Sequence, residues 1–218
     1  MIPKLGCSIL LLASAALAQN KLMPGTAVSV KPDDVSPRSK NSYQPITAKQ
    51  RIKWMIRATV GPKSLTAGLF TAGWGTLEND PKSYGPHWEG FGERYGIRLS
   101  GISLSNTMEA GLGSIWGEDP RYRSDEGAPF VHRIEHAAEM TFMARNRDGN
   151  LIPAYARFIA VPGSNFISNA WRAPGQDDTE HAVIRTGLGF AGRFLSNTFD
   201  EFWPDVQQKV FHRDAAQQ

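Results

Sequence analysis

This chain contains almost no cysteine. Its 218 residues include a single one, Cys7, close to the amino terminus. One cysteine cannot form a disulfide within the chain, and it cannot supply the cysteine clusters that bind structural zinc or iron–sulfur centres. The fold must therefore be held together by packing and hydrogen bonds.

The chain also lacks a large excess of either charge, long apolar runs and strand-like alternation of apolar and polar residues. Lys and Arg number 24 and Asp and Glu number 21, which gives a net charge of +3. The two signs are interspersed without a basic stripe, which argues against a nucleic-acid partner. After residue 18, no apolar run approaches the roughly 20 residues of an ordinary membrane-spanning helix. No segment shows sustained alternation of Val, Ile and Thr with polar residues, so strands are not predicted.

Residues 1–18 have the features of a secretory signal peptide. Lys4 provides a positive start, residues 5–17 are apolar and small, and Ala16-Leu17-Ala18 is a small-x-small cleavage site. The apolar run is too short for a transmembrane anchor. Cleavage there would remove Cys7 and lower the net charge from +3 to +2, because Lys4 is the only charged residue lost. We therefore predict export to the periplasm, the outer envelope or the medium.

The rest of the chain predicts an all-α fold with about six helices in one glycine-rich, tightly packed bundle. Residues 19–46 carry four prolines among polar residues and are predicted to be a disordered leader. The helical domain is predicted over 47–204, followed by a polar tail over 205–218. Capping signals, prolines and glycine turns place six helices at 47–60, 64–77, 88–117, 131–144, 153–171 and 177–203.

One pattern occurs three times: an Arg followed eleven and twelve residues later by Ser and Asn. The first and third copies also share glycines and an acidic residue at a constant offset of 91. Eleven residues are close to three helical turns, so each copy forms a polar stripe on one helix face. Nine residues form this predicted buried polar stripe: Arg94, Ser105, Asn106, Arg157, Ser168, Asn169, Arg185, Ser196 and Asn197.

We interpret the stripe as structural, because buried polar groups commonly fix helix packing through hydrogen bonds to neighbouring helices. The third, fifth and sixth predicted helices would then pack around a shared axis, with close crossings at Gly101 and Gly192. The alternative is a polar cavity that binds a ligand.

The two arginines at the start of the first and third copies need acidic partners if they are buried. The sequence offers Glu109, Asp200 or Glu201 as the expected partners of Arg94 and Arg185.

The sharpest catalytic motif is His132-Arg-Ile-Glu135-His136. His-x-x-Glu-His on a helix places two imidazoles one turn apart beside a carboxylate, as in the inverted zinc peptidases. In this hypothesis His132 and His136 bind zinc and Glu135 is the general base of a zinc-dependent hydrolase. A third ligand would come from downstream: Glu180, Asp200 or Glu201. The alternative is a solvated helix face with no enzymatic role.

Two further possibilities stay open. Paired carboxylates could hydrolyse glycosides, and the available acids are Glu89, Glu93, Glu109, Glu118 and Asp119. An aromatic cluster lies among glycines and consists of Tyr84, His87, Trp88, Phe91 and Tyr95. Such rings either pack on glycine faces or contact a membrane surface or a sugar. A serine hydrolase is not predicted, because no Gly-x-Ser-x-Gly elbow is present.

Several motifs together resemble a known family. They are Trp88-Glu-Gly-Phe-Gly-Glu-Arg-Tyr-Gly96, Asp119-Pro-Arg-Tyr122 and Arg147-Asp-Gly-Asn150, the last before a helix with a Ser-Asn pair. With them the chain resembles, from about Lys49 to Trp203, a family of uncharacterised exported bacterial helical proteins without an assigned activity. The resemblance implies an exported helical domain and no particular chemistry. The His-x-x-Glu-His string is not a hallmark of that family, which weakens the zinc hypothesis.

Together these features predict a non-enzymatic structural or interaction protein of the periplasm or cell envelope. Small-residue stripes on several helices are also typical of association with a membrane or with further copies of the chain. The predicted partners are therefore a membrane surface, an envelope protein or a second copy. No cofactor is predicted apart from zinc in the alternative hypothesis.

Overall fold

The computed structural model describes residues 43–211, with side chains as far as Lys209. The predicted signal peptide and residues 19–42 of the predicted leader lie outside this range. The described chain is all-α, as predicted. Its six α-helices are α1 (Ala48–Val60), α2 (Pro62–Glu78), α3 (Trp88–Trp116), α4 (Phe130–Phe142), α5 (Tyr155–Ser168) and α6 (Thr179–Phe211). Two short 3₁₀ helices, η1 (Lys82–Tyr84) and η2 (Asn169–Trp171), precede α3 and α6.

Local signals set most helix ends. Thr47 Oγ1 accepts a hydrogen bond from the Gln50 amide at 3.3 Å, and Gln50 Oε1 accepts one from the Thr47 amide at 3.0 Å. This capping box begins α1 as predicted. At the start of α6, Asp178 Oδ1 accepts from the His181 amide at 2.8 Å. α3 ends at Gly117, whose φ of 77° lies in the left-handed region that glycine favours.

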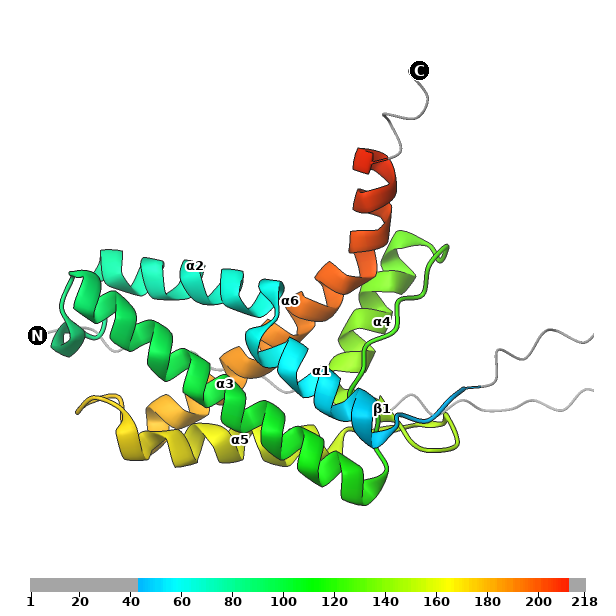
Figure 1. Cartoon of the computed structure of the whole chain (residues 1–218), viewed down its shortest axis with the longest axis horizontal. Coiled ribbons are helices and arrows are strands. Elements are labelled where there is room, and N and C mark those ends of the chain that lie inside the picture. Colours follow the sequence, from blue (N-terminus) through cyan, green and yellow to red (C-terminus); the bar gives the residue numbers. More distant parts are fainter. Residues whose placement is uncertain (1–42, 212–218) are drawn as a thin grey trace, which may run out of the picture. The chain divides into compact units, whose positions relative to one another are not determined.

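The sixth helix does not end at Trp203, so that predicted boundary is wrong. α6 continues through Pro204, and residues 205–211 of the predicted tail are helical. Proline removes a backbone donor and usually bends a helix, and the last turns of α6 change direction (Figure 1). Arg133 bonds to Glu201 before the proline and to Asp205 after it, which holds the helix together across the bend.

A short hairpin was missed by the sequence analysis. β1 (Met143–Arg145) and β2 (Leu151–Pro153) pair antiparallel around the predicted turn, with Ala144 opposite Ile152. Three residues per strand are too few to show a period-2 pattern. The amide of Asp119 also donates to the Arg145 carbonyl at 2.8 Å, which ties the segment after α3 to this hairpin.

The end of the predicted leader is packed against the helical domain. Tyr43 Oη donates to Asp119 Oδ2 at 3.0 Å, and the guanidinium of Arg123 lies 4.9 Å from the centre of the Tyr43 ring. Burial, followed by the negative charge of Asp119, raises the pKa of Tyr43 to about 12. Residues 43–46 therefore belong to the folded unit, although they form no helix.

The helices form two equivalent three-helix units, α1–α3 and α4–α6. In each unit the third helix packs against both the first and the second. The two units meet mainly through α3 and α5, and Figure 1 shows α3 between α2 and α5. The first helices begin 82 residues apart, at Ala48 and Phe130, and the third helices begin 91 residues apart, at Trp88 and Thr179.

Two ion pairs link the units, but the packing between them is not reciprocal, because α3 packs extensively against α5 and α6 has no comparable contact with α2. Glu109 on α3 pairs with Arg157 near the start of α5, with Nε to Oε1 at 3.0 Å. Asp200, which is 91 residues after Glu109, pairs with Lys63 near the start of α2 at 2.6 Å. The similarity of the third and sixth helices thus includes their packing against the two preceding helices, but not the contact between those two, because α1 packs against α2 and α4 has no comparable contact with α5.

Close helix approaches are not at the predicted glycines. No heavy atom lies within 4 Å of a Cβ built on Gly101 or Gly192, so the prediction of tight crossings there is wrong. A Cβ on Gly68 would lie 2.8 Å from the Arg98 guanidinium. In the other unit the glycine lies on the third helix instead of the second. Gly189 of α6 faces Val161 of α5, whose side chain lies 2.9 Å from a Cβ built on that glycine.

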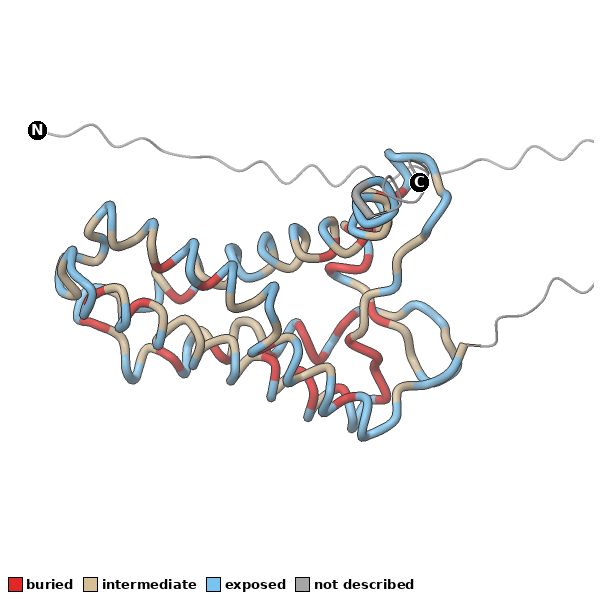
Figure 2. The backbone as a smooth tube through the Cα atoms, turned by 45° about the horizontal axis from the view of Figure 1, so that its top comes forward, coloured by how far each residue is buried: buried red, intermediate tan, exposed pale blue. Residues whose placement is uncertain are grey.

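Most buried side chains are small or polar, and many large apolar side chains are exposed. Among the described residues, the buried apolar side chains are nine alanines and Met140. Eight charged residues are buried with them: Arg51, Arg94, Glu109, Glu118, Asp119, Arg133, Arg157 and Glu201. In Figure 2 the buried segments lie along the inner faces of the helices. Large apolar residues such as Phe70, Trp88 and Leu188 are exposed.

Candidate functional site: a buried polar network and an adjoining groove

Arg157 lies at the centre of the buried polar network. Its Nε donates to Glu109 Oε1 at 3.0 Å, and its Nη1 donates to the carbonyls of Met140 and Thr141 at 2.9 and 2.8 Å. Arg193 Nη2 donates to the same Glu109 oxygen at 2.8 Å. Burial, and then the charge of Arg193, lower the pKa of Arg157 to about 10. The Arg157 side chain therefore joins α3, α4 and α5. It belongs to the second copy of the sequence pattern, which lacks the glycines that the first and third copies share.

Arg94 and Arg185 bind loops and not the expected acids. Arg94 donates to the carbonyls of Asp80, Pro81 and Gly85 at 2.9, 3.0 and 2.8 Å. The predicted pairing with Glu109 is wrong because fifteen residues along one helix separate the two groups by about 22 Å.

Arg185 plays the same part in the second unit. It donates to the Gln176 carbonyl at 2.7 Å and to the Asn169 side chain. Asp200 and Glu201 lie far along the same helix and pair instead with Lys63 and Arg133.

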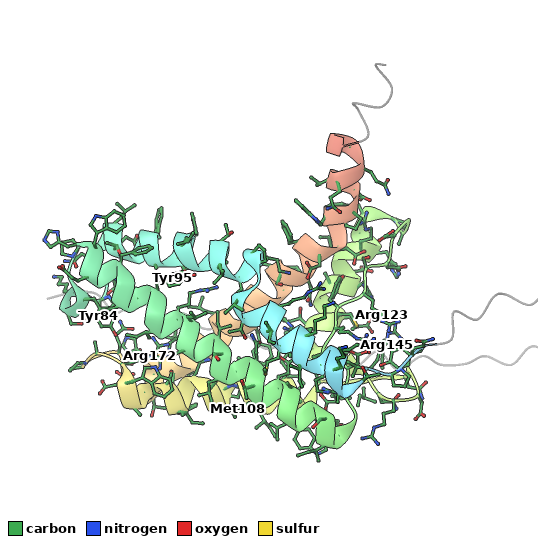
Figure 3. All side chains as sticks on the ribbon, in the orientation of Figure 1. Tyr84, Tyr95, Met108, Arg123, Arg145 and Arg172 are labelled. Carbon is green, nitrogen blue, oxygen red and sulfur yellow. The ribbon has the colours of Figure 1, made fainter. Side chains whose placement is uncertain are left out.

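The loops that these two arginines hold also meet each other. Tyr84 lies under the Arg94 guanidinium at 5.5 Å, and its hydroxyl accepts from the Ala173 amide at 3.1 Å. Arg172 Nε donates to Ser168 Oγ at 3.2 Å. Figure 3 shows Tyr84 and Arg172 at the same end of the bundle. The aromatic residue Tyr84 of the predicted cluster therefore has a packing role.

The asparagines of the first and third copies cross-link helices as predicted. Asn106 Nδ2 donates to Thr59 on α1 at 3.1 Å, and Asn197 Nδ2 donates to Thr141 on α4 at 3.2 Å. Both threonines are the last residue but one of a 13-residue helix.

The hydrogen bonds of two further stripe residues, Ser168 and Asn169, are made to residues nearby in the sequence. Ser168 Oγ donates to the Asn165 carbonyl at 2.8 Å, and Asn169 Nδ2 donates to the Asp178 carbonyl at 3.1 Å. Ser105 and Ser196 are half-buried. Most hydrogen bonds of the stripe residues are therefore made to other protein groups, although Arg185 Nε is buried without a partner among the described residues.

A second buried cluster surrounds Glu201, which is fully buried. Its carboxylate accepts hydrogen bonds from Tyr122 Oη, from the Asp125 amide at 2.9 Å and from Arg133 Nε at 3.1 Å. His136 Nδ1 lies 3.6 Å from the same carboxylate. Burial raises the pKa of Glu201, but the bonds from Tyr122, Asp125 and Arg133 outweigh it and hold the pKa below its ordinary value.

The histidine motif is divided between two environments. His132 is largely exposed and lies 3.3 Å from Asp125, whereas His136 faces Tyr122 and Glu201. Glu135 is exposed, with 72% of its side-chain surface accessible. Within residues 43–211, no group of three His, Cys, Asp or Glu side chains could hold a metal ion.

The acids considered for glycoside hydrolysis have structural partners where they are buried. Both carboxylate oxygens of Glu118 accept from the Ala156 amide, at 3.2 and 3.1 Å, and so cap the start of α5. Asp119 is bound by Arg121, with Nη2 to Oδ2 at 2.6 Å. Burial raises the pKa of Asp119, but the hydrogen bonds from Arg121 lower it below its ordinary value.

A groove of about 540 Å³ lies beside this network, between α1 and the second half of α3. Its lining is mostly small or apolar, with Arg51 and Arg147 as its charged residues: Pro45, Ile46, Ala48, Arg51, Ile52, Met55, Thr107, Ala110, Gly111, Ser114, Gly117 and Arg147. This groove was not predicted from the sequence. A signal was present, because Arg51-Ile52 with Thr59 has the same spacing as Arg133-Ile134 with Thr141.

The comparisons with known proteins add no relative. No family model matches the chain, and neither a curated protein nor a solved structure gives a significant match. The resemblance to uncharacterised exported bacterial proteins therefore stays a prediction, and function must be argued from the residues.

Proposed function

We propose that this protein is a non-enzymatic exported protein of the cell envelope that binds a lipid surface through α5 and α6. The observation that carries this proposal is the inverted polarity of α5. Its single charged residue, Arg157, is 3% exposed, while its exposed side chains are Tyr155, Phe158, Ile159, Phe166 and Ile167.

The apolar surface continues from α5 onto its neighbours. α5 packs against α6, whose exposed side chains include Val183, Ile184 and Leu188. Phe142, Phe158 and Phe190 join α4, α5 and α6 in one aromatic cluster, with ring centres 5.6 to 6.3 Å apart. A contiguous apolar surface of this kind is typical of proteins that bind another apolar surface.

Two features favour lipid over a protein partner. Protein interfaces usually carry a polar rim, and the exposed face of α5 has no charged side chain. Tyr155 and Trp171 lie near its two ends and are 53% and 41% exposed, and such amphipathic rings are enriched where a membrane meets water. Within residues 43–211, no helix is both long and apolar enough to cross a membrane, so binding at the interface is the mode proposed.

The polar interior supports a structural role and not a catalytic one. The buried polar side chains form hydrogen bonds with other helices of the fold, as seen for Arg157, Glu109 and Asn197. Such a network keeps the helices in register when their apolar faces are turned outward, because each unsatisfied buried polar group would cost roughly 1–3 kcal/mol.

Flotation with phosphatidylcholine vesicles tests the proposal. The full chain should float with the vesicles, and Phe158→Glu/Phe166→Glu should stay at the bottom of the gradient. Each Phe removed from water contributes about 1.5–3 kcal/mol, so two charged substitutions should abolish binding. Ser100→Glu/Ser103→Glu, at exposed positions of α3, adds the same charge elsewhere and should still float.

Circular dichroism must show that all three proteins are folded. The proposal is overturned if the unaltered chain does not float. It is also overturned if the chain is a stable dimer that Phe158→Glu/Phe166→Glu converts to a monomer, since the α5–α6 surface would then bind a second copy.

A further inference from the structure

Arg51 and Arg133 occupy equivalent positions in the two units. Each is the fourth residue of a 13-residue helix, 82 positions apart, and each is buried, with 8% and 6% of its surface exposed. Arg133 binds Glu201 on α6, whereas Arg51 donates to the Glu118 carbonyl, just after the end of α3, at 2.6 Å.

The two arginines differ in their carboxylate partners. Arg133 binds two carboxylates on α6, those of Glu201 and Asp205. The constant offset of 91 residues places Ala110 and Ser114 of α3 at the equivalent positions. The first unit therefore keeps the buried guanidinium but lacks both of these acids on its third helix. Burial lowers the pKa of Arg51, and the charges of Asp119 and Glu118 oppose this, but neither carboxylate forms an ion pair with it.

Arg51 is left with an unused donor. Its Nη1 is buried and has no hydrogen-bond partner among the described residues. An unsatisfied buried donor costs roughly 1–3 kcal/mol, more for a charged group. Arg185 Nε and Asn79 Oδ1 also lack partners among the described residues, but Arg51 is the one of the three that lines the groove.

The space left by the missing acids belongs to the groove. Ala110 and Ser114 line it together with Arg51. Arg147, the second charged residue of the lining, is exposed and makes one long bond, from Nη2 to the Ser114 carbonyl at 3.4 Å. Ile52 and Met55 provide an apolar wall on the α1 side.

We propose that this groove binds an amphiphile with a carboxylate head and one apolar chain, such as a medium-chain fatty acid. The carboxylate binds Arg51, as Glu201 binds Arg133 in the other unit, and Arg147 adds a second positive charge. Arginine forms strong charge-assisted bonds with carboxylates, and the volume of about 540 Å³ lies in the usual range for small-molecule sites. The chain packs along Ile52, Met55 and Gly111.

The structure offers a sharp test, because an acid can be restored where the second unit has one. Dodecanoate, below its micelle concentration, is titrated into the full chain by calorimetry, with dodecanol as the uncharged control. We expect dodecanoate to bind at least tenfold more tightly than dodecanol. Ser114→Asp, which reproduces Asp205, should weaken dodecanoate at least tenfold, whereas Ser103→Asp, an exposed position outside the groove, should change it less than twofold.

Two results would overturn the proposal. They are equal binding of dodecanoate and dodecanol, and full affinity in Ser114→Asp. The proposal does not depend on lipid-surface binding. Phe158→Glu/Phe166→Glu leaves the groove intact, so loss of flotation with retained dodecanoate binding separates the two.

Discussion

Asn106 and Asn197, 91 residues apart in the chain, make the same hydrogen bond in two different three-helix units. Each donates its side-chain amide to a threonine, Thr59 or Thr141, at 3.1 or 3.2 Å. Each threonine in turn donates to the carbonyl four residues before it at 2.8 Å. These two buried bonds at matching positions show that α3 and α6 contact α1 and α4 in the same way.

Asn106→Ala and Asn197→Ala should therefore destabilise the protein by similar amounts, about 1–3 kcal/mol each. Urea unfolding measures the change in the free energy of unfolding. In a double-mutant cycle with Thr59→Val, the Asn106→Ala effect should shrink, because the hydroxyl that accepts the bond is already absent. A large effect for one asparagine and none for the other would contradict the equivalence of the two units.

Removal of Arg157 should be far more damaging than loss of the surface pair between Lys63 and Asp200. Arg157→Met leaves Glu109 buried with only Arg193 as its cationic partner, and breaking a buried pair typically costs about 3–5 kcal/mol. Asp200→Asn breaks the pair with Lys63, whose side chains are 41% and 43% exposed, and should cost less than about 1 kcal/mol. Comparable losses in thermal or urea unfolding would show that Arg157 is not the centre of the network.

Replacing glycine by alanine should change the stability in opposite directions at two positions of α3. A Cβ on Gly90 would lie 2.2 Å from the Tyr84 carbonyl oxygen and 2.3 Å from that of Gly85, so Gly90→Ala must displace η1 and lower the unfolding temperature. Gly101 faces open space, so Gly101→Ala should stabilise the helix by up to about 1 kcal/mol. Destabilisation by Gly101→Ala would indicate that a partner covers this face in solution.

Acid should unfold the protein partly through Glu201. Because its folded pKa lies below its unfolded value, its stabilising contribution is complete above the unfolded pKa and is lost as the pH falls through the folded pKa. Glu201→Gln should thus flatten the fall in unfolding free energy on the acid side of about pH 4, besides lowering stability at neutral pH. Glu135→Gln, at an exposed position of α4, should keep the slope of the unaltered chain.

The sequence predicted the helices well where their ends depend on neighbouring residues. The capping box at Thr47, the Asp178 cap and the stop at Gly117 act within a few residues of the helix that they limit. The sequence failed at Pro204, because Arg133 bridges the proline from another helix. The prediction of close crossings at Gly101 and Gly192 was wrong, because a glycine in the sequence does not indicate which other helix, if any, packs against it.

The candidate sites show the same division. The sequence alone determined that helices lie around 88–117 and 177–203, that they share a pattern, and that the pattern carries polar groups suited to burial. Only the tertiary structure decided what each group binds. Arg94 and Arg185 bind nearby loops, Arg157 joins three helices, and the groove beside Arg51 exists because two acids of one unit are missing from the other. Spacing along a helix fixes which residues share a face, but partners come from helices that are distant in the chain, and their approach depends on the packing of the whole fold.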